Sequence, residues 1–208
     1  NTFFYIIGGG NETFDGLGLD RLMSYAAKFG FGSKTGIDLP TEANGFLPSK
    51  EWKENTYNEP WYIGDTYNVA IGQGNFIVTP LQIARSIAVF ANGGYLVRPK
   101  LVAKEEPAEQ ITTPENVQII RKAMRETITN GTAQMLKTSA VEIAGKTGTA
   151  QWSSIKSPHS WFVGFAPYNA PTLSVTVLVE EGADDYLSVP IAKDIFDWWF
   201  ARYPILAE

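Results

Sequence analysis

The chain has 208 residues, of which 44% are hydrophobic and 19% are charged, a balance typical of a folded globular protein. Seventeen Lys and Arg against 22 Asp and Glu give a formal net charge of -5. This charge argues against a nucleic-acid-binding surface and against polybasic attachment to anionic lipid. The sequence has no Cys and one His, so thiolate metal sites and Cys nucleophiles are excluded, and we expect no metal ion or other cofactor.

Cysteine usage leaves the compartment open, because a chain without Cys fits both a reducing cytosol and a bacterial envelope. No apolar run reaches the roughly 18 residues of a membrane span. We therefore expect any membrane anchor to lie outside these residues.

The first half of the chain is rich in glycine and proline, and its periodic segments are helical. Apolar residues recur at helical spacing over Leu19–Phe29, and Gly30 follows as a stop signal. Residues 35–65 are rich in aromatic residues and show neither helix nor strand periodicity, so we expect an ordered excursion that covers another part of the protein. Thr79-Pro80 then supplies the cap and first-turn proline of a helix that ends at Asn92-Gly93.

The second half predicts one more helix, then strands, then a final helix. Thr113-Pro114 begins a helix that ends at Asn130. Three strands are predicted over Val141–Ala144, Trp161–Ala166 and Leu173–Val179, and the short turn before the last one favours antiparallel pairing. A helix over about residues 190–203 is expected to cover this sheet with a face formed by Ile191, Ile195, Trp198 and Trp199.

The tetrapeptide Lys146-Thr147-Gly148-Thr149 follows the first predicted strand and combines a cation, two hydroxyls and a residue without a side chain. A Gly at a strand edge lets a substrate backbone pair with the strand, while the Lys charge and Thr hydroxyl attract a carboxylate. From these residues alone, a strand that enters a turn with a solvated Lys is an equally good interpretation. A phosphate-binding loop fits poorly, because its pattern requires Gly where the sequence has Ala140.

The single histidine, His159, lies between Pro158 and Ser160 in a polar connection. We interpret it as an exposed side chain at the rim of a site and not as a catalytic base.

A series of short motifs runs through most of the chain in a fixed order: Asn1-Thr2-Phe3-Phe4-Tyr5, Lys34-Thr35-Gly36-Ile37-Asp38-Leu39-Pro40, Trp52, Gly64-Asp65-Thr66, Ile71-Gly72-Gln73-Gly74, Thr79-Pro80, Gly131-Thr132-Ala133, Lys146-Thr147-Gly148-Thr149-Ala150-Gln151 and Trp161-Phe162-Val163-Gly164-Phe165-Ala166-Pro167. Each is weak evidence alone. Together they resemble the C-terminal part of the transpeptidase domain of class B penicillin-binding proteins, in particular the elongation type, penicillin-binding protein 2.

The resemblance implies an α+β fold of the serine transpeptidase, β-lactamase-like type, in which helices flank an antiparallel sheet. Residues 1–208 would then be the C-terminal portion of a single domain, with the excursion at about 35–65. The family transfers acyl groups through a serine ester, using Ser-x-x-Lys, Ser-x-Asn and Lys-Thr-Gly motifs.

The same resemblance assigns roles to five residues of this chain. Lys146 would help to hold the proton network around the serine in its charged state. Thr147 and Thr149 would bind the terminal carboxylate of a D-alanyl peptide or β-lactam, Gly148 would be a substrate-binding position between them, and the Thr149 N–H would supply an oxyanion-hole donor. Asn1 resembles the last residue of Ser-x-Asn and would orient the substrate amide and the catalytic lysine.

The sequence departs from the family pattern because no nucleophile motif fits within it. The Ser-x-x-Lys helix and the strands before it would lie upstream of Asn1, so we expect an incomplete sheet and an associated upstream polypeptide that carries the nucleophile. Ser153-Ser154-Ile155-Lys156 matches Ser-x-x-Lys, but we interpret the match as coincidence, because Pro158 follows and no helix is expected there.

The leading interpretation is a peptidoglycan D,D-transpeptidase that cross-links stem peptides and is acylated by β-lactams. A non-catalytic β-lactam-sensing domain and a β-lactamase on the same fold are the alternatives, although no residue here would supply a deacylating base. The resemblance also implies the extracytoplasmic face of the bacterial cytoplasmic membrane, with a membrane glycan polymerase and shape-determining envelope proteins as partners.

Overall fold

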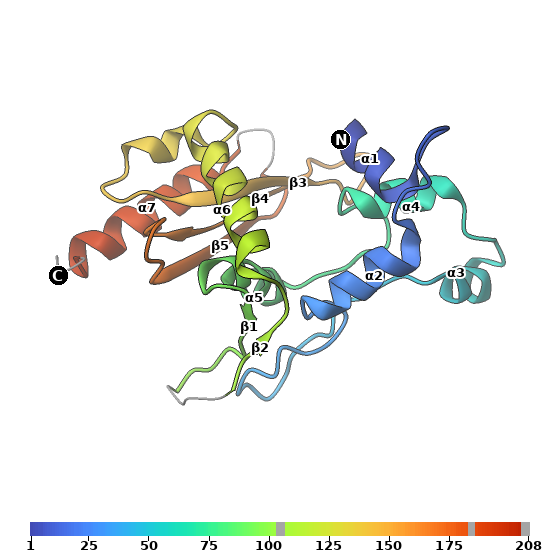
Figure 1. The fold of residues 1–208 in the computed structure, drawn as a ribbon, viewed down its shortest axis with the longest axis horizontal. Helices are drawn as coiled ribbons and strands as arrows, with labels where there is room; N and C mark the ends of the chain where they lie inside the picture. Colours follow the sequence, from blue (N-terminus) through green and yellow to red (C-terminus); the bar gives the residue numbers. More distant parts are fainter. Residues whose placement is uncertain (103–106, 183–185, 205–208) are drawn as a thin grey trace. The chain divides into compact units, whose positions relative to one another are not determined.

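The computed structural model describes residues 1–102, 107–182 and 186–204 (Figure 1). The chain forms two compact units, one of Asn1–Gln82 with Pro99–Leu101 and the other of Ile83–Arg98 with Val102–Glu208. That residues 1–208 belong to a single domain stays a prediction.

Four helices lie wholly in the first unit: α1 (Thr2–Gly9), α2 (Gly18–Lys28), α3 (Lys50–Tyr57) and α4 (Ile63–Ala70). The helix predicted over residues 19–29 is confirmed as α2. α1 packs closely against α4, because a Cβ on Gly8 would lie 2.3 Å from the Ala70 Cβ and one on Gly9 would lie 2.3 Å from the Tyr67 ring. The glycines that follow the aromatic residues of α1 are therefore packing residues.

The segment predicted as an excursion, residues 35–65, contains α3 and the start of α4, and its role in covering another part of the protein stays a prediction. Buried polar side chains hold it in place. Gln82 donates from Nε2 to the carbonyls of Ser33 at 2.8 Å and Asn44 at 2.7 Å. Lys53, also buried, donates to Asp65 Oδ2 at 2.5 Å.

Helix α5 (Pro80–Ala91) contains the boundary between the two units, and the remaining elements lie in the second. In chain order these are β1 (Tyr95–Leu96), β2 (Glu109–Gln110), α6 (Pro114–Thr129), the 3-10 helix η1 (Gln134–Thr138), β3 (Ala144–Ala150), β4 (His159–Ala166), β5 (Leu173–Val179) and α7 (Ser188–Arg202). The predicted helices at 80–91 and 114–129 are confirmed. Their caps are also present, since Thr79 Oγ1 accepts from Gln82 N and Thr113 Oγ1 accepts from Asn116 N.

Strands β3, β4 and β5 form an antiparallel sheet in that order, between two layers of helix (Figure 1). On one face, Phe162 and Val177 pack with Phe196 of α7. On the other face, Phe165 packs with Met124 of α6 and with apolar residues of α5. This double cover fixes the position of β3, the strand that carries the Lys-Thr-Gly motif.

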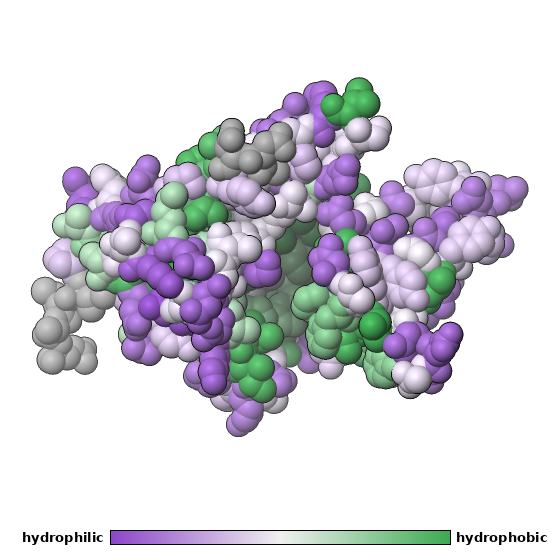
Figure 2. Space-filling view, turned by 90° about the horizontal axis from the view of Figure 1, so that it is seen from above, coloured by the Kyte–Doolittle hydropathy of each residue, from purple (hydrophilic) through white to green (hydrophobic). Residues whose placement is uncertain are grey.

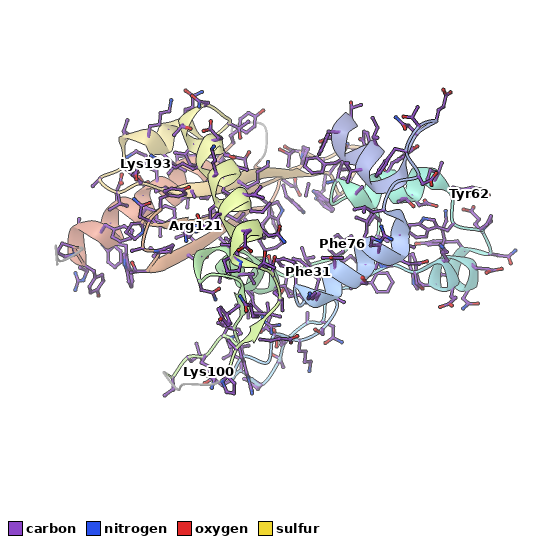
Figure 3. All side chains as sticks on the ribbon, in the orientation of Figure 1. Phe31, Tyr62, Phe76, Lys100, Arg121 and Lys193 are labelled. Atoms are coloured by element: carbon purple, nitrogen blue, oxygen red, sulfur yellow. The ribbon has the colours of Figure 1, made fainter. Side chains whose placement is uncertain are left out.

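Arg121 projects from α6 in this second layer (Figure 3). Its guanidinium carbon lies 5.4 Å from the ring centroids of both Phe165 and Tyr168, and Nη2 donates to the Tyr168 carbonyl. A cation stacked on aromatic rings thus completes the packing between α6 and the sheet.

The strand predicted over residues 141–144 is wrong in its position, because β3 begins where that prediction ends. The Ile143 carbonyl accepts from Arg125 Nη1 at 2.8 Å, and the Glu142 carbonyl accepts from Tyr168 N at 2.8 Å. These bonds take the two residues out of the ladder. The Lys-Thr-Gly motif therefore lies within the strand and not after it.

The face predicted for the last helix is wrong for three of its four residues, whereas Trp199 is partly buried and packs against the core as predicted. The residues of α7 that are buried against the sheet are Ser188, Val189, Ala192, Phe196 and Phe200. The predicted residues Ile191, Ile195 and Trp198 are instead 41%, 38% and 59% exposed. The surface in Figure 2 shows hydrophobic side chains as separate patches among hydrophilic ones.

Candidate active site

Strand β3 is an outer strand of its sheet within the described residues, since only β4 pairs with it. A Cβ on Gly145 would lie 2.8 Å from the Val163 carbonyl oxygen, and one on Gly164 would lie 2.6 Å from the Ala144 carbonyl oxygen. Both carbonyls therefore face into the β3–β4 ladder, in which Lys146 is opposite Val163. The backbone N–H and C=O groups of successive residues point to opposite sides of a strand. Those of Lys146 face β4, and those of Thr147 and Thr149 therefore face the unpaired edge.

Lys146 lies on this edge and donates from Nζ to the Thr147 carbonyl at 2.6 Å. That bond agrees with an outward-facing carbonyl at Thr147. The residue is exposed, but its amine is partly desolvated, and this desolvation lowers the pKa of Lys146 from its ordinary value. A lysine of this kind gives up its proton more readily than a fully solvated one, which suits a proton network.

The Thr147 side chain has a partner that sequence reasoning missed. Its Oγ1 lies 2.6 Å from Oγ1 of Thr132, which belongs to the loop between α6 and η1. Gly131-Thr132-Ala133 was part of the resemblance, but no role followed from it. The structure therefore brings together one amine, two hydroxyls and the open backbone groups of Thr147 and Thr149.

The two glycines of β3 differ in what surrounds them. A Cβ on Gly145 would lie 2.5 Å from Cζ of Phe162, which is fully buried, so Gly145 is required by the core. A Cβ on Gly148 would lie 3.2 Å from the Trp161 Cβ, which needs only a small adjustment. Packing alone does not explain glycine at position 148.

Asn1 lies in the first unit, at the start of α1, and its carbonyl accepts from Tyr5 N at 3.0 Å. Its side chain makes no capping hydrogen bond. The role of Asn1 beside Lys146 stays a prediction.

His159 belongs to a cluster at the turn between β3 and β4. Its ring stacks on Trp152 with 5.3 Å between centroids, and Nδ1 accepts from Glu181 N at 3.1 Å. Lys156 contacts the same two residues as His159. Its Nζ lies 4.6 Å from the Trp152 ring centroid and donates to Glu181 Oε1 at 2.8 Å. His159 is half-buried and is the first residue of β4, so the prediction of an exposed side chain in a polar connection is wrong.

The same cluster bears on Ser153-Ser154-Ile155-Lys156. Ser153 Oγ accepts from Ile155 N, and the segment forms no helix. Because Lys156 pairs with Glu181, the geometry supports the interpretation of this match as coincidence.

Within residues 1–102, 107–182 and 186–204, no group of three or more His, Asp or Glu could hold a metal ion. No helix in those ranges is long and apolar enough to cross a membrane.

The penicillin-binding protein transpeptidase domain family matches residues 1–197 of the chain. The peptidoglycan D,D-transpeptidase MrdA of Acinetobacter baumannii is 36% identical over 96% of this chain and 33% of that protein. The chain therefore spans about a third of the length of the curated relatives that it matches.

Solved structures give the same relationship. PBP2 of Helicobacter pylori, in a complex with MreC, matches with a TM-score of 0.84 at 31% identity, over 98% of this chain and 38% of that one. PBP2 of Pseudomonas aeruginosa, in complex with WCK 5153, matches with a TM-score of 0.82 at 37% identity, over 96% of this chain and 46% of that one. The predicted fold class is thus confirmed, and the chain belongs to the penicillin-binding protein transpeptidase domain family, with PBP2 proteins among its relatives.

Proposed function

We propose that this chain is part of a peptidoglycan D,D-transpeptidase that cross-links stem peptides and is acylated by β-lactams. The observation that carries the proposal is the unpaired edge of β3, where Lys146 and the outward backbone groups of Thr147 and Thr149 lie together. An extended peptide binds such an edge by adding a strand to it. A peptide that ends in a carboxylate would place this charge near the Lys146 amine and the Thr147 hydroxyl.

The proposed chemistry proceeds through an acyl-serine. The serine oxygen attacks the carbonyl carbon of the penultimate D-Ala, and the terminal D-Ala leaves with a proton. An amine of a second stem peptide then attacks the ester and restores the serine hydroxyl. The Thr149 N–H stabilises the negative oxygen that forms in each step, while Lys146 and Asn1 hold the proton network and the substrate amide.

The serine itself would come from the part of the relatives' length that this chain does not span. Two features of the second unit support an associated segment of that kind. β5 is the other outer strand of the sheet within the described residues, and the exposed face of α7 carries Ile191, Ile195 and Trp198. Strands added beside β5 would pair its edge and cover apolar surface.

Location and partners follow from the proposed reaction. Stem peptides of the cell wall lie outside the cytoplasmic membrane, so the site would face the extracytoplasmic side, with an anchor outside these residues. The PBP2 of Helicobacter pylori was solved with MreC, and we propose a partner of that kind together with a membrane glycan polymerase.

The test is to incubate the full-length protein with a fluorescent penicillin, denature it, and locate the label by gel and by mass analysis of peptides. We expect the label on a serine outside residues 1–208. A label on Ser153 would move the nucleophile into this chain, and no label at all would contradict the proposal.

Two further assays separate the proposed enzyme from its alternatives. Formation of cross-linked product from a donor and an acceptor stem peptide distinguishes a transpeptidase from a β-lactam-sensing domain. Rapid hydrolysis of a chromogenic cephalosporin would instead indicate a β-lactamase.

A further inference from the structure

Thr132 contacts the candidate site from a loop whose backbone is fixed on both sides. Ala133 N donates to the Thr127 carbonyl at 3.1 Å, and both Ala133 and Leu136 are 1% exposed. A Cβ on Gly131 would lie 2.8 Å from the Thr127 Cα, so the chain passes close to the end of α6 just before Thr132. The Thr132 hydroxyl is therefore held at the β3 edge, although its side chain is exposed.

The direction of the hydrogen bond between the Thr132 and Thr147 hydroxyls decides whether Thr147 can donate a hydrogen to a ligand. Each threonine hydroxyl carries one hydrogen and can accept two hydrogen bonds. At the 2.6 Å separation between Thr132 Oγ1 and Thr147 Oγ1, either atom can be the donor. If Thr147 donates to Thr132, it has no hydrogen left for a ligand.

We propose that Thr132 is a positioning residue that donates to Thr147 Oγ1 and thereby directs the Thr147 hydrogen at the carboxylate of the bound peptide or β-lactam. This inference rests on the proposed function. A hydrogen bond to a carboxylate is stronger than one between two neutral hydroxyls, so the ligand selects Thr147 as the donor toward itself. Thr132 then supplies the hydrogen that Thr147 accepts, and the two bonds in series strengthen each other.

A purely structural role would predict a different result. Because Thr132 is exposed and Thr147 is half-buried, water can replace the bond between them when one hydroxyl is removed. The buried residues Ala133 and Leu136 would still hold the loop. Loss of the Thr132 hydroxyl should therefore change ligand capture and leave thermal stability unchanged.

The experiment uses the full-length protein with Thr132→Val, which keeps the shape and removes the hydroxyl, and Thr132→Ser, which restores the donor. Thr138→Val is the matched control, because the Thr138 hydroxyl is exposed and donates only to the Met135 carbonyl in the same region. For Thr132→Val we expect KM for a stem-peptide donor to rise about three- to tenfold, the usual effect of one hydrogen bond, with kcat within about twofold. Thr132→Ser and Thr138→Val should resemble the wild type, and all three variants should keep its melting temperature.

A double-mutant cycle with Thr147→Val shows whether the two hydroxyls act as one unit. We expect Thr132→Val to add almost nothing once the Thr147 hydroxyl is absent. The Thr132→Val effect should also vanish with a donor peptide whose terminal carboxylate is replaced by an amide.

Independent, additive losses from the two valine variants would overturn the inference, as would a Thr132→Val protein that equals the wild type. So would a loss that Thr132→Ser fails to restore. Each of these outcomes leaves the proposed function standing. A wild-type protein that is not acylated by penicillin would overturn both.

Discussion

The chain contains the tripeptide Lys-Thr-Gly twice, once in each unit, and the two copies have different structures. Lys34-Thr35-Gly36 lies in a segment of the first unit that is neither helix nor strand, and Gly36 has a φ of 80° there. Lys146-Thr147-Gly148 lies within strand β3 of the second unit, where Gly148 has ordinary strand geometry. The same three residues therefore do not determine which copy binds a ligand.

The two copies differ in the hydrogen-bond partners of their backbone groups. In the first copy, one carboxylate, that of Glu42, accepts the N–H of Thr35 at 2.7 Å and that of Gly36 at 3.1 Å, and the Thr35 side chain is buried. In the second copy, alternate backbone groups face an edge that no strand of the described residues pairs. An internal carboxylate thus occupies the place in the first copy that a ligand is proposed to take in the second.

Lysine substitution should give the largest contrast between the two copies. Lys146→Ala should reduce acylation by a fluorescent penicillin at least about 100-fold, the usual scale for loss of a group in a catalytic proton network. Its stability should not fall, because removing a partly desolvated amine removes an unfavourable burial. Lys34→Ala is the matched control and should be acylated like the wild type. Near-normal labelling of the Lys146 variant would exclude that residue from the mechanism.

Glycine substitution should affect stability more in the first copy than in the second. Gly36→Ala places a side chain at a positive φ and should destabilise the first unit by about 1–2 kcal/mol. Gly148→Ala should change stability by less than about 0.5 kcal/mol, because an alanine in a strand compensates for the mild crowding against Trp161. Thermal unfolding of both variants measures this contrast. If Gly148→Ala were the more destabilising change, position 148 would be a packing requirement like Gly145.

The helices and strands that the sequence predicted correctly have local signals, such as a helix cap or several alternating apolar residues. Thr79-Pro80 and Thr113-Pro114 locate α5 and α6 because a capping hydroxyl and a first-turn proline specify a helix start without help from tertiary contacts. β5 was predicted at its observed bounds, since Leu173, Val175 and Val177 alternate with polar residues. The motifs of the second Lys-Thr-Gly copy were likewise visible before the fold.

The features that were missed depend on contacts between distant residues. α1, α3 and α4 have eight residues each, so they complete about two turns and show too little periodicity to be recognised. α7 is apolar on several faces, and only its packing against Phe162 and Val177 selects Phe196 over Ile195. The Thr132–Thr147 pair joins residues fifteen positions apart, and no local sequence pattern predicts this contact.

Threonine substitution should give a smaller contrast. Thr35 is buried, its Oγ1 accepts from Ile37 N at 3.4 Å, and its side chain also bonds to Glu42, so Thr35→Val should cost about 1 kcal/mol of stability through the loss of these hydrogen bonds. It should leave acylation unchanged. Thr147→Val should keep the melting temperature and slow acylation about tenfold, because it removes the proposed carboxylate donor. Parallel melting and penicillin-labelling measurements on the two variants test this, and slow acylation of Thr35→Val would show that the first copy also contributes to the site.

The smallest effect concerns pH and applies to the first copy alone. Hydrogen bonding from Thr35, first through its side chain and then through its N–H, together with the Gly36 N–H, lowers the pKa of Glu42. A carboxyl whose pKa is lower in the folded state stabilises the fold above its unfolded pKa, and this stabilisation is lost as the pH falls through the folded pKa. Hydrogen exchange should therefore become faster at the Thr35 and Gly36 amides in acid, after correction for intrinsic rates. Glu42→Gln should abolish that dependence, and the amides of Thr147 and Thr149 should not share it. A matching acid response at β3 would mean that the two copies are not held independently, because protonation of Glu42 removes an acceptor from the first copy only.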